Sequence, residues 1–487
     1  SNYVFSHIRN DSLIASDHHV DETITFNQDD FPYLTAELGG GLQVTGHRRP
    51  IATGTDIGAM SITKLGSGVG LLGYYMYHGG SNPNGKLSTL QESRAIGYAN
   101  ELPEINYDFN APIRQYGTIS DNYREIRLLA YFLQDFGADL AVLPADIDPD
   151  FVKPGDTHTL RVSVRHDDTH GYVFVNNYQR RLTMDDHKDV VLEGKTKGEP
   201  VHFPKTDIAS GEYAFYPYNM KLKNAVLVSA LATPLCKLSC NGEDVYVFYG
   251  DKDPQFTWDG TPAKVLHLSR ADALSAARVT LKDHQEYLVL SDDFVWEESG
   301  VLRVVGGEET IIRTFPKLSK DVLPADFKEI ADEGELAVYK RSQNNANAQT
   351  SVSFVQSAKT PDELSGKLVN SCGQPETLKG DEKIYEISVQ YAKENREGRK
   401  EGYDCILSFD YACESMELYV NGRKVNDYFY TGQKALFSLG YFDFPTEITA
   451  VLHPLHEGDH IYLQEWPKMD DKKACRIEAV TLTEQFS

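Results

Sequence analysis

Two apolar runs near the start of the chain each end abruptly in glycines. The first, FPYLTAELGGGL, covers residues 31–42, and the second, LLGYYMYHGGSNP, covers residues 71–83. An apolar or aromatic run broken by glycines is typical of a buried β-strand that delivers its last side chains into a cleft. The sequence therefore predicts two strands whose ends lie beside a ligand site.

Apolar residues at helical spacing follow each of these runs. Residues 56–65 are predicted to form a short helix. A longer helix is predicted over residues 120–136, with Ser120 as the N-cap and Gly137 as the C-cap. This part of the chain is therefore predicted to combine strands with helices.

From about Pro144 onward, the pattern changes to short alternating segments separated by Asp, Gly and Pro clusters. This pattern is typical of β-sandwiches. Residues 160–182 are predicted to form a hairpin, and Asn421-Gly422 is the strongest hairpin-turn signal in the chain. A polar stretch at 341–350, RSQNNANAQT, marks a boundary between two β-rich domains.

Glu37 is the candidate reactive side chain at the end of the first run. The glycines at 39–41 allow the backbone to turn away behind it. The second run supplies Tyr75, His78 and Asn82. Tyrosine, histidine and asparagine around one carboxylate suit a polyhydroxylated ligand, because each offers a hydrogen bond and the aromatic rings offer an apolar face to a sugar.

The net charge of the chain favours some classes of binding partner over others. The 48 Lys and Arg residues stand against 72 Asp and Glu residues, which gives a formal net charge of -24. An acidic surface repels nucleic acid phosphates and anionic membranes, so neutral partners are favoured. The sequence has no run of eighteen apolar residues, so no membrane span is predicted.

No metal or cofactor site is predicted. The segment SDHHVDE at 16–22 favours a solvated loop, because adjacent histidines rarely converge on one ion. The GxGxxG at 68–73 lacks the preceding strand and following helix that dinucleotide binding requires. Six cysteines are too sparse for a disulfide framework, and the spacing of Cys236 and Cys240 favours two core residues on one face of a strand.

Three motifs in a fixed order carry a resemblance to a known family. They are ELGGG from Glu37, YYMYHGGSNPNGK from Tyr74 and YDFNAPIRQYG from Tyr107. Together they resemble the C-terminal part of the catalytic barrel of glycoside hydrolase family 35, the β-galactosidase family. The resemblance covers residues 31–137. This chain has Phe109 and Asn110 where the family usually has Tyr and Asp.

The resemblance implies roles for particular residues. Glu37 would end the seventh strand of a (β/α)8 TIM barrel and act as the nucleophile of a retaining mechanism. The implied substrate-binding residues are Tyr75, His78, Asn82, Tyr107 and Phe109. The family's acid/base lies in an Asn-Glu pair on the fourth strand. Asn100-Glu101 is such a pair, but it follows the nucleophile in a predicted loop, which favours a surface glutamate.

The expected fold is therefore multidomain, α/β plus all-β. Residues 1–143 would be the C-terminal portion of the (β/α)8 barrel, 144–345 one or more β-sandwich domains, and 346–487 a jelly-roll, galactose-binding-like domain. A complete barrel takes roughly 250 residues. The first strands and the acid/base are accordingly expected in an N-terminal part that this sequence does not contain.

The resemblance also implies an activity. The expected function is that of a retaining exo-glycoside hydrolase that releases terminal β-linked galactose from oligosaccharides or polysaccharides, with no cofactor, in an extracellular or periplasmic location. The alternative is a non-catalytic carbohydrate-binding protein in which the partial barrel serves as a scaffold.

Overall fold

The computed structural model is dominated by β-strands, which hold 43% of the chain against 11% in helices. This distribution confirms the β-rich class predicted from the sequence. The structure describes residues 2–7, 27, 30–148, 152–307, 309–342, 350–392 and 402–487.

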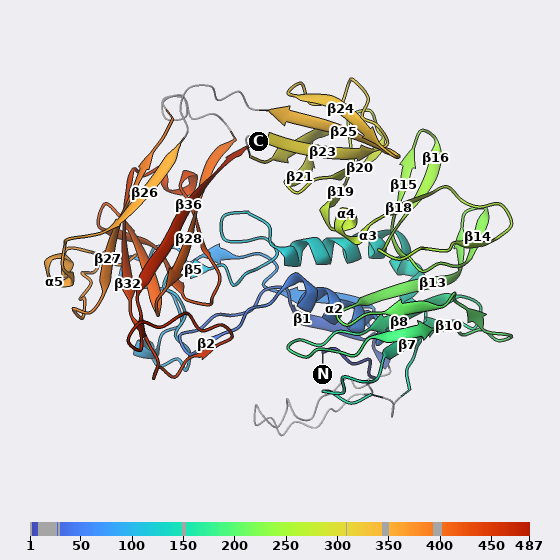
Figure 1. Cartoon of the computed structure of the whole chain (residues 1–487), viewed down its shortest axis with the longest axis horizontal. Helices are drawn as coiled ribbons and strands as arrows, with labels where there is room; N and C mark the ends of the chain where they lie inside the picture. The colour runs from blue at the N-terminus through green and yellow to red at the C-terminus, as the bar shows by residue number, and fades with distance from the viewer. Residues whose placement is uncertain are drawn as a thin grey trace.

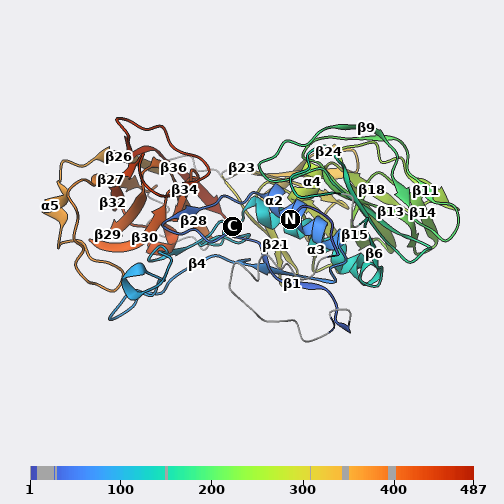
Figure 2. The same ribbon diagram turned by 90° about the horizontal axis from the view of Figure 1, so that it is seen from below.

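A parallel β-α-β unit forms the first part of the described chain. Strand β1 (Leu34–Gly39) pairs in parallel with β3 (Leu71–Tyr75), and helix α2 (Gly54–Gly66) lies between them in sequence. Thr53 begins α2 with a capping box, which satisfies N–H groups of the first turn. Helix α3 (Asp121–Ala141) packs against α2, and both helices lie near the middle of the molecule (Figures 1 and 2).

Helix α3 runs past the end predicted from the sequence. It continues to Ala141, so the prediction of Gly137 as the C-cap is wrong. Leu140 and Leu143 are each 1% exposed, in a core that α2 and α3 share with β8 (Gly171–Asn176). Burial of these side chains offsets the cost of a helical glycine, which is about 1 kcal/mol.

The middle of the chain forms mostly antiparallel sheets. The largest has the strand order β17-β14-β13-β8-β7-β6, and its β7–β8 pair confirms the hairpin predicted at 160–182. A five-stranded sheet, β19-β20-β23-β25-β24, a three-stranded sheet, β15-β16-β18, and several two-stranded sheets lie in the same region. The bounds are β6 Ala145–Asp146, β7 Arg161–His166, β13 Tyr213–Leu222, β14 Ala225–Ser229, β15 Thr233–Cys240, β16 Glu243–Tyr249, β17 Thr257–Asp259, β18 Val265–Leu268, β19 Ala276–Thr280, β20 Glu286–Leu290, β23 Glu309–Phe315, β24 Phe327–Glu333 and β25 Leu336–Ser342.

Cys236 and Cys240 lie together on β15. Both side chains are buried in one hydrophobic cluster, which confirms their prediction as core residues. Burial raises the pKa of the Cys236 thiol to about 12. This thiol is therefore protonated at neutral pH and contributes packing rather than reactivity.

Two antiparallel sheets form the C-terminal region around one shared core. The first has the order β26-β27-β32-β29-β30 and the second the order β31-β28-β36. The β29–β30 hairpin turns at Asn421-Gly422, both with positive φ, which confirms the predicted turn. The bounds are β26 Ser351–Gln356, β27 Lys383–Gln390, β28 Tyr403–Ala412, β29 Ser415–Val420, β30 Arg423–Phe429, β31 Ala435–Ser438, β32 Glu447–His453 and β36 Arg476–Phe486.

One strand of the C-terminal sheets, β30, forms hydrogen bonds with the segment around β5 in the N-terminal part of the chain. Strand β5 (Asn106–Tyr107) pairs with β4 (Gly80–Ser81) and lies beside the orange C-terminal strands in Figure 1. The Asp427 carboxylate on β30 accepts hydrogen bonds from the backbone N–H groups of residues 104–106, at 2.5, 2.8 and 3.1 Å. The position of β5 therefore depends on a residue more than 300 positions away in the sequence.

A buried lysine close to this contact, Lys424, forms ion pairs with three carboxylates. The Lys424 ammonium lies 2.9 Å from Glu104, 2.8 Å from Glu376 and 2.8 Å from Glu417. The Lys424 side chain is 5% exposed, so the carboxylates substitute for its lost hydration. Glu104 belongs to the N-terminal part, so this cluster also spans the junction.

His453 extends the same charge cluster. Its Nδ1 lies 3.5 Å from Glu382, and its Nε2 lies 3.5 Å from Glu417. Burial acts to lower the pKa of His453, but the hydrogen bond to Glu417 and the charges of Glu417, Glu382 and Glu414 outweigh it, so the pKa is raised. The folded protein therefore favours the charged imidazolium.

We expect Lys424→Met to lower the free energy of unfolding by about 3–5 kcal/mol, because it leaves buried carboxylates without their cation. Chemical denaturation measures the change. The matched control is Lys188→Met, which removes an ammonium paired with Asp207 at 2.9 Å on the surface. The control is expected to have a much smaller effect, because water solvates both charges of an exposed ion pair. Equal effects of the two substitutions would contradict the structural role of the cluster.

We expect the stability difference between the unaltered protein and His453→Gln to depend on pH. Because the folded-state pKa of His453 is raised above its ordinary 6.5, its contribution is fully present below about pH 6.5 and is lost as the pH rises through the raised value. Thermal unfolding across this range tests the sign. A difference that grows with rising pH would refute it.

Candidate site at the ends of β1 and β3

Glu37 lies at an irregularity near the end of β1. The β1–β3 register shifts between Thr35 and Leu38, so Glu37 falls where the two strands lose their regular pairing. Its side chain is exposed. A bulge of this kind re-aims side chains at the end of a strand.

The expectation that β1 is a buried strand is wrong. Only Leu38 of β1 is buried, whereas Leu34 on β1 is 50% exposed and Leu71 on β3 is 57% exposed. Among the residues that the structure describes, β1 and β3 pair only with each other. A two-stranded sheet leaves both outer edges open, which explains the exposure of these apolar side chains.

The glycines after Glu37 pass through a narrow space. The N–H groups of Gly40 and Gly41 both donate to the Tyr75 carbonyl, at 2.9 and 3.1 Å, and Leu42 donates to the Phe109 carbonyl at 3.0 Å. A Cβ on Gly41 would lie 2.9 Å from the Phe109 carbonyl oxygen. Glycine is required here because two other segments approach its backbone closely.

The charge of Glu37 acts on one of the two tyrosines expected at this site. Burial and then the charges of Glu37 and Glu92 raise the pKa of Tyr75. Burial, then Tyr75 and Glu92, raise the pKa of Tyr107. Tyr75 therefore lies within electrostatic reach of Glu37, and Tyr107 lies within reach of Tyr75 and Glu92. The roles expected for these residues stay predictions. Glu92 joins them from the loop before β5, and no strand or motif around it signals this position.

Phe109 supports this cluster from below. Its ring lies 4.5 Å from the Tyr107 ring, and its side chain is 3% exposed. Phe109 therefore packs under Tyr107. In this structure Phe109 supports the Tyr107 ring. The substrate contact expected for Phe109 stays a prediction.

His78 and Asn82 hold the backbone around the site. His78 is exposed, and its Nδ1 interacts with the Gly79 carbonyl. The Asn82 side chain donates to the Glu104 carbonyl at 3.1 Å, and its N–H donates to Ile105 at 2.8 Å. Asn82 therefore positions the segment that leads into β5, whereas His78 remains accessible.

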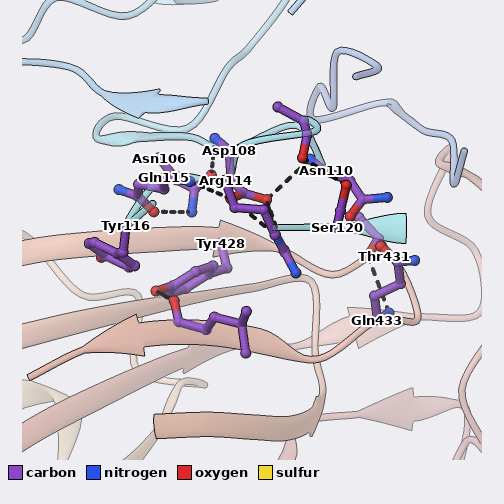
Figure 3. A network of polar contacts seen from close by, with 12 residues as sticks. Asn106, Asp108, Asn110, Arg114, Gln115, Tyr116, Ser120, Tyr428, Thr431 and Gln433 are labelled. Carbon is purple, nitrogen blue, oxygen red and sulfur yellow. Dashed lines mark hydrogen bonds and ion pairs between the residues drawn. The ribbon is translucent and has the colours of Figure 1, made fainter. Parts of the chain in front are cut away.

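A network of polar contacts holds the tight turn that follows Tyr107 (Figure 3). The Asp108 carboxylate accepts from the Arg114 guanidinium at 2.8 Å and from the N–H groups of Asn110 and Gln115 at 3.1 and 2.8 Å. Phe109 and Asn110 both have positive φ, 47° and 51°. Such conformations cost of order 1–3 kcal/mol each, so the hydrogen bonds of Asp108 are needed to hold them.

Asn122, in the first turn of α3, links this turn to the glycine segment. Its side-chain amide donates to the carbonyls of Gly40 and Asn110, at 2.7 and 3.1 Å. It is 1% exposed. Nothing in the local sequence distinguishes this asparagine from an ordinary exposed residue of a first helical turn.

A small cavity lies between the turn and the C-terminal strands. Its volume is about 70 Å³, and Asp108, Arg114, Tyr428, Thr431 and Gln433 are among its lining residues. Small-molecule sites occupy roughly 300–1,000 Å³. This cavity is therefore the size of a few water molecules and belongs to the support of the site.

The remaining sequence candidates do not join the cluster. The Glu101 carboxylate accepts from the Arg94 N–H at 2.7 Å in the loop before β5, as a surface glutamate would. Within the described ranges, no three His, Cys, Asp or Glu side chains are arranged to hold a metal ion. The segment 16–22 lies outside the described residues. No helix among the described residues is both long and apolar enough to cross a membrane.

Comparison with known proteins adds no relative: no protein-family model and no curated protein sequence matches this chain. The described residues place the exposed Glu37 carboxylate at a strand end within electrostatic reach of Tyr75, with the exposed His78 and Tyr107 on the segments that follow β3. Such a set can act on a neutral, hydroxyl-rich molecule, because it combines one negative charge with hydrogen-bond donors and aromatic faces.

We expect Gly41→Ala to destabilise the protein by about 1–3 kcal/mol, because its Cβ would press on the Phe109 carbonyl and displace the turn. Gly80→Ala is the matched control, since a Cβ on Gly80 meets no atom within 4 Å. Thermal unfolding of both variants checks the prediction. Equal melting temperatures for the two would show that the segment tolerates a side chain at 41.

Proposed function

We propose that this chain carries the nucleophile and part of the sugar site of a retaining β-galactosidase-like glycoside hydrolase. The observation that carries the proposal is the exposed Glu37 carboxylate near the end of β1, whose charge acts on the Tyr75 hydroxyl. Its substrate would be a terminal β-linked galactose of an oligosaccharide or polysaccharide, met outside the cell or in the periplasm. The resemblance of the three motifs to glycoside hydrolase family 35 supports this choice of sugar.

The proposal includes a finer description of the fold. Strands β1 and β3 are parallel, with α2 between them in sequence, and α3 follows after the short strands β4 and β5. This arrangement supports the assignment to the strand–helix repeat of a (β/α)8 barrel. In this proposal β1 and β3 are the seventh and eighth strands, residues 144–345 form β-sandwich domains, and 346–487 form a jelly-roll domain. The exposed Leu34 and Leu71 support the idea that further barrel strands cover this small sheet.

In the proposed mechanism, a Glu37 oxygen attacks the anomeric carbon while the bond to the leaving oxygen breaks. A second carboxyl group protonates that oxygen and later removes a proton from the water that releases the sugar. The two carboxyl groups of retaining enzymes lie roughly 5 Å apart. The proposal assigns the acid/base to an earlier barrel strand outside this sequence, and it assigns to the Tyr75 hydroxyl the role of donating a hydrogen bond to the Glu37 carboxylate.

A fluorosugar reagent tests Glu37 without requiring the acid/base. Dinitrophenolate leaves without a proton, so 2,4-dinitrophenyl 2-deoxy-2-fluoro-β-galactoside needs only the nucleophile to form a covalent adduct. We expect one fluorogalactosyl group on the protein, with peptide mass spectrometry placing it on Glu37. Glu37→Gln is expected to remain unlabelled and to lower any hydrolysis of nitrophenyl β-galactoside at least about 1,000-fold.

Glu101→Gln is the matched control, because it makes the same change at a glutamate of the loop before β5 and is expected to label like the unaltered protein. A label on any other residue would refute the assignment of Glu37. No label on a folded protein would favour the alternative function, carbohydrate binding without catalysis.

A further inference from the structure

A second, larger cleft lies where three parts of the chain meet. Its volume is about 570 Å³. It is lined by residues 116–119 and Arg124, by the hairpin of β21 (Phe294–Glu298) and β22 (Val301–Val305), and by β28 and β36. Gly306, just after β22, pairs with Phe486 of β36 through two backbone hydrogen bonds of 3.0 and 2.8 Å. The walls of the cleft are therefore tied to one another.

Two aromatic rings form one wall of this cleft. Phe294 and Trp296 are two residues apart on β21, so they share one face of the hairpin. Their rings are stacked, with centroids 5.4 Å apart and planes 23° apart. The opposite face carries Val295, Leu302 and Val304, which are buried in a hydrophobic cluster. The core thus anchors the hairpin while the aromatic pair remains partly exposed toward the cleft.

Helix α3 supports this aromatic pair from behind. The Tyr123 ring lies 6.1 Å from the Phe294 ring in an edge-on arrangement. The Arg127 guanidinium in turn lies 5.3 Å from the Tyr123 ring centroid. The rings are therefore held in place before any ligand arrives, which lowers the entropic cost of binding.

Polar groups surround the aromatic wall. The Arg124 guanidinium donates to the Asp292 carbonyl at 2.5 Å, which fixes the loop that carries the Asp292 and Asp293 side chains. Burial raises the pKa of Asp293. Thr483 and Gln485 line the opposite wall from β36. The cleft therefore combines flat apolar rings with side chains that donate hydrogen bonds and side chains that accept them.

This combination selects among classes of ligand. Stacked rings present an apolar surface to the C–H face of a sugar, while carboxylate, amide and hydroxyl groups bind its hydroxyls. Phosphate and polyanionic ligands are disfavoured by Asp292 and Asp293 and by the net charge of -24. A purely apolar ligand would leave the polar groups of the walls unpaired. The cleft volume falls within the roughly 300–1,000 Å³ of small-molecule sites.

We propose that the cleft between α3, the β21–β22 hairpin and β36 binds a neutral oligosaccharide at the Phe294–Trp296 pair. None of the residues of the Glu37 cluster lines this cleft. The proposal is accordingly independent of the catalytic assignment, and it holds for a hydrolase and for a non-catalytic binding protein alike.

Isothermal titration of the Glu37→Gln protein with β-1,4-galactotetraose, cellotetraose and xylotetraose tests the cleft without turnover. We expect at least one of the three to bind, and Trp296→Ala to weaken that binding at least about tenfold by removing the stacking surface. Trp296→Phe is expected to retain most of the affinity, and Gln485→Ala to lower it a few-fold. Trp466→Ala is the matched control, because Trp466 is 44% exposed and does not line the cleft.

Thermal unfolding confirms that each variant is folded. If none of the three tetrasaccharides binds at millimolar concentration, the proposal is overturned. Binding that survives Trp296→Ala unchanged overturns it equally, since the sugar then lies elsewhere. Failure of the fluorosugar to label Glu37 has no bearing on either outcome, so the two proposals fail separately.

Discussion

The hydrogen bonds between the Asp427 carboxylate and the backbone of residues 104–106 are the contact on which the candidate site depends. Burial raises the pKa of Asp427 to about 6, although Lys424 and the three N–H groups oppose that rise. The ionised carboxylate is thus costly to bury and is tolerated because its partners are in place. Without it, the start of β5 would have three buried N–H groups to satisfy by other means.

The position of β5 determines the rest of the site through a series of contacts. Strand β5 ends at Tyr107, and the Asp108 turn after it places the Phe109 carbonyl where Leu42 donates. That carbonyl limits position 41 to glycine. The glycine segment then sets the direction in which Glu37 leaves β1. A carboxylate in the C-terminal sheets thereby determines the geometry around a carboxylate in the N-terminal unit.

The sequence predicted the local elements and missed the contacts between distant ones. The two glycine-terminated runs became β1 and β3, residues 56–65 lie within α2, and Asn421-Gly422 turns a hairpin. These features depend on local spacing and turn chemistry.

The interior of β30 could not be predicted in this way. Lys424, Asn426 and Asp427 are buried there, whereas Val425 is only half-buried. The reason is that β30 is the edge strand of its sheet and contacts the polar 104–116 segment, where Asn426 donates to Gln115 at 3.0 Å. The same limit applies to β1, whose apolar residues suggested burial although its sheet has two open edges.

Three consecutive residues at the start of α3 connect the two proposed binding places. Asn122 donates to the carbonyls of Gly40 and Asn110 behind Glu37, the Tyr123 ring contacts Phe294, and Arg124 holds the Asp292 loop. Successive side chains on a helix point about 100° apart, so one turn can reach two different sites. The Tyr77 ring, from the segment after β3, also lies 6.5 Å from Tyr123. The first turn of α3 thus fixes the glycine segment and the aromatic cleft to one rigid element, and any movement of this turn would change both.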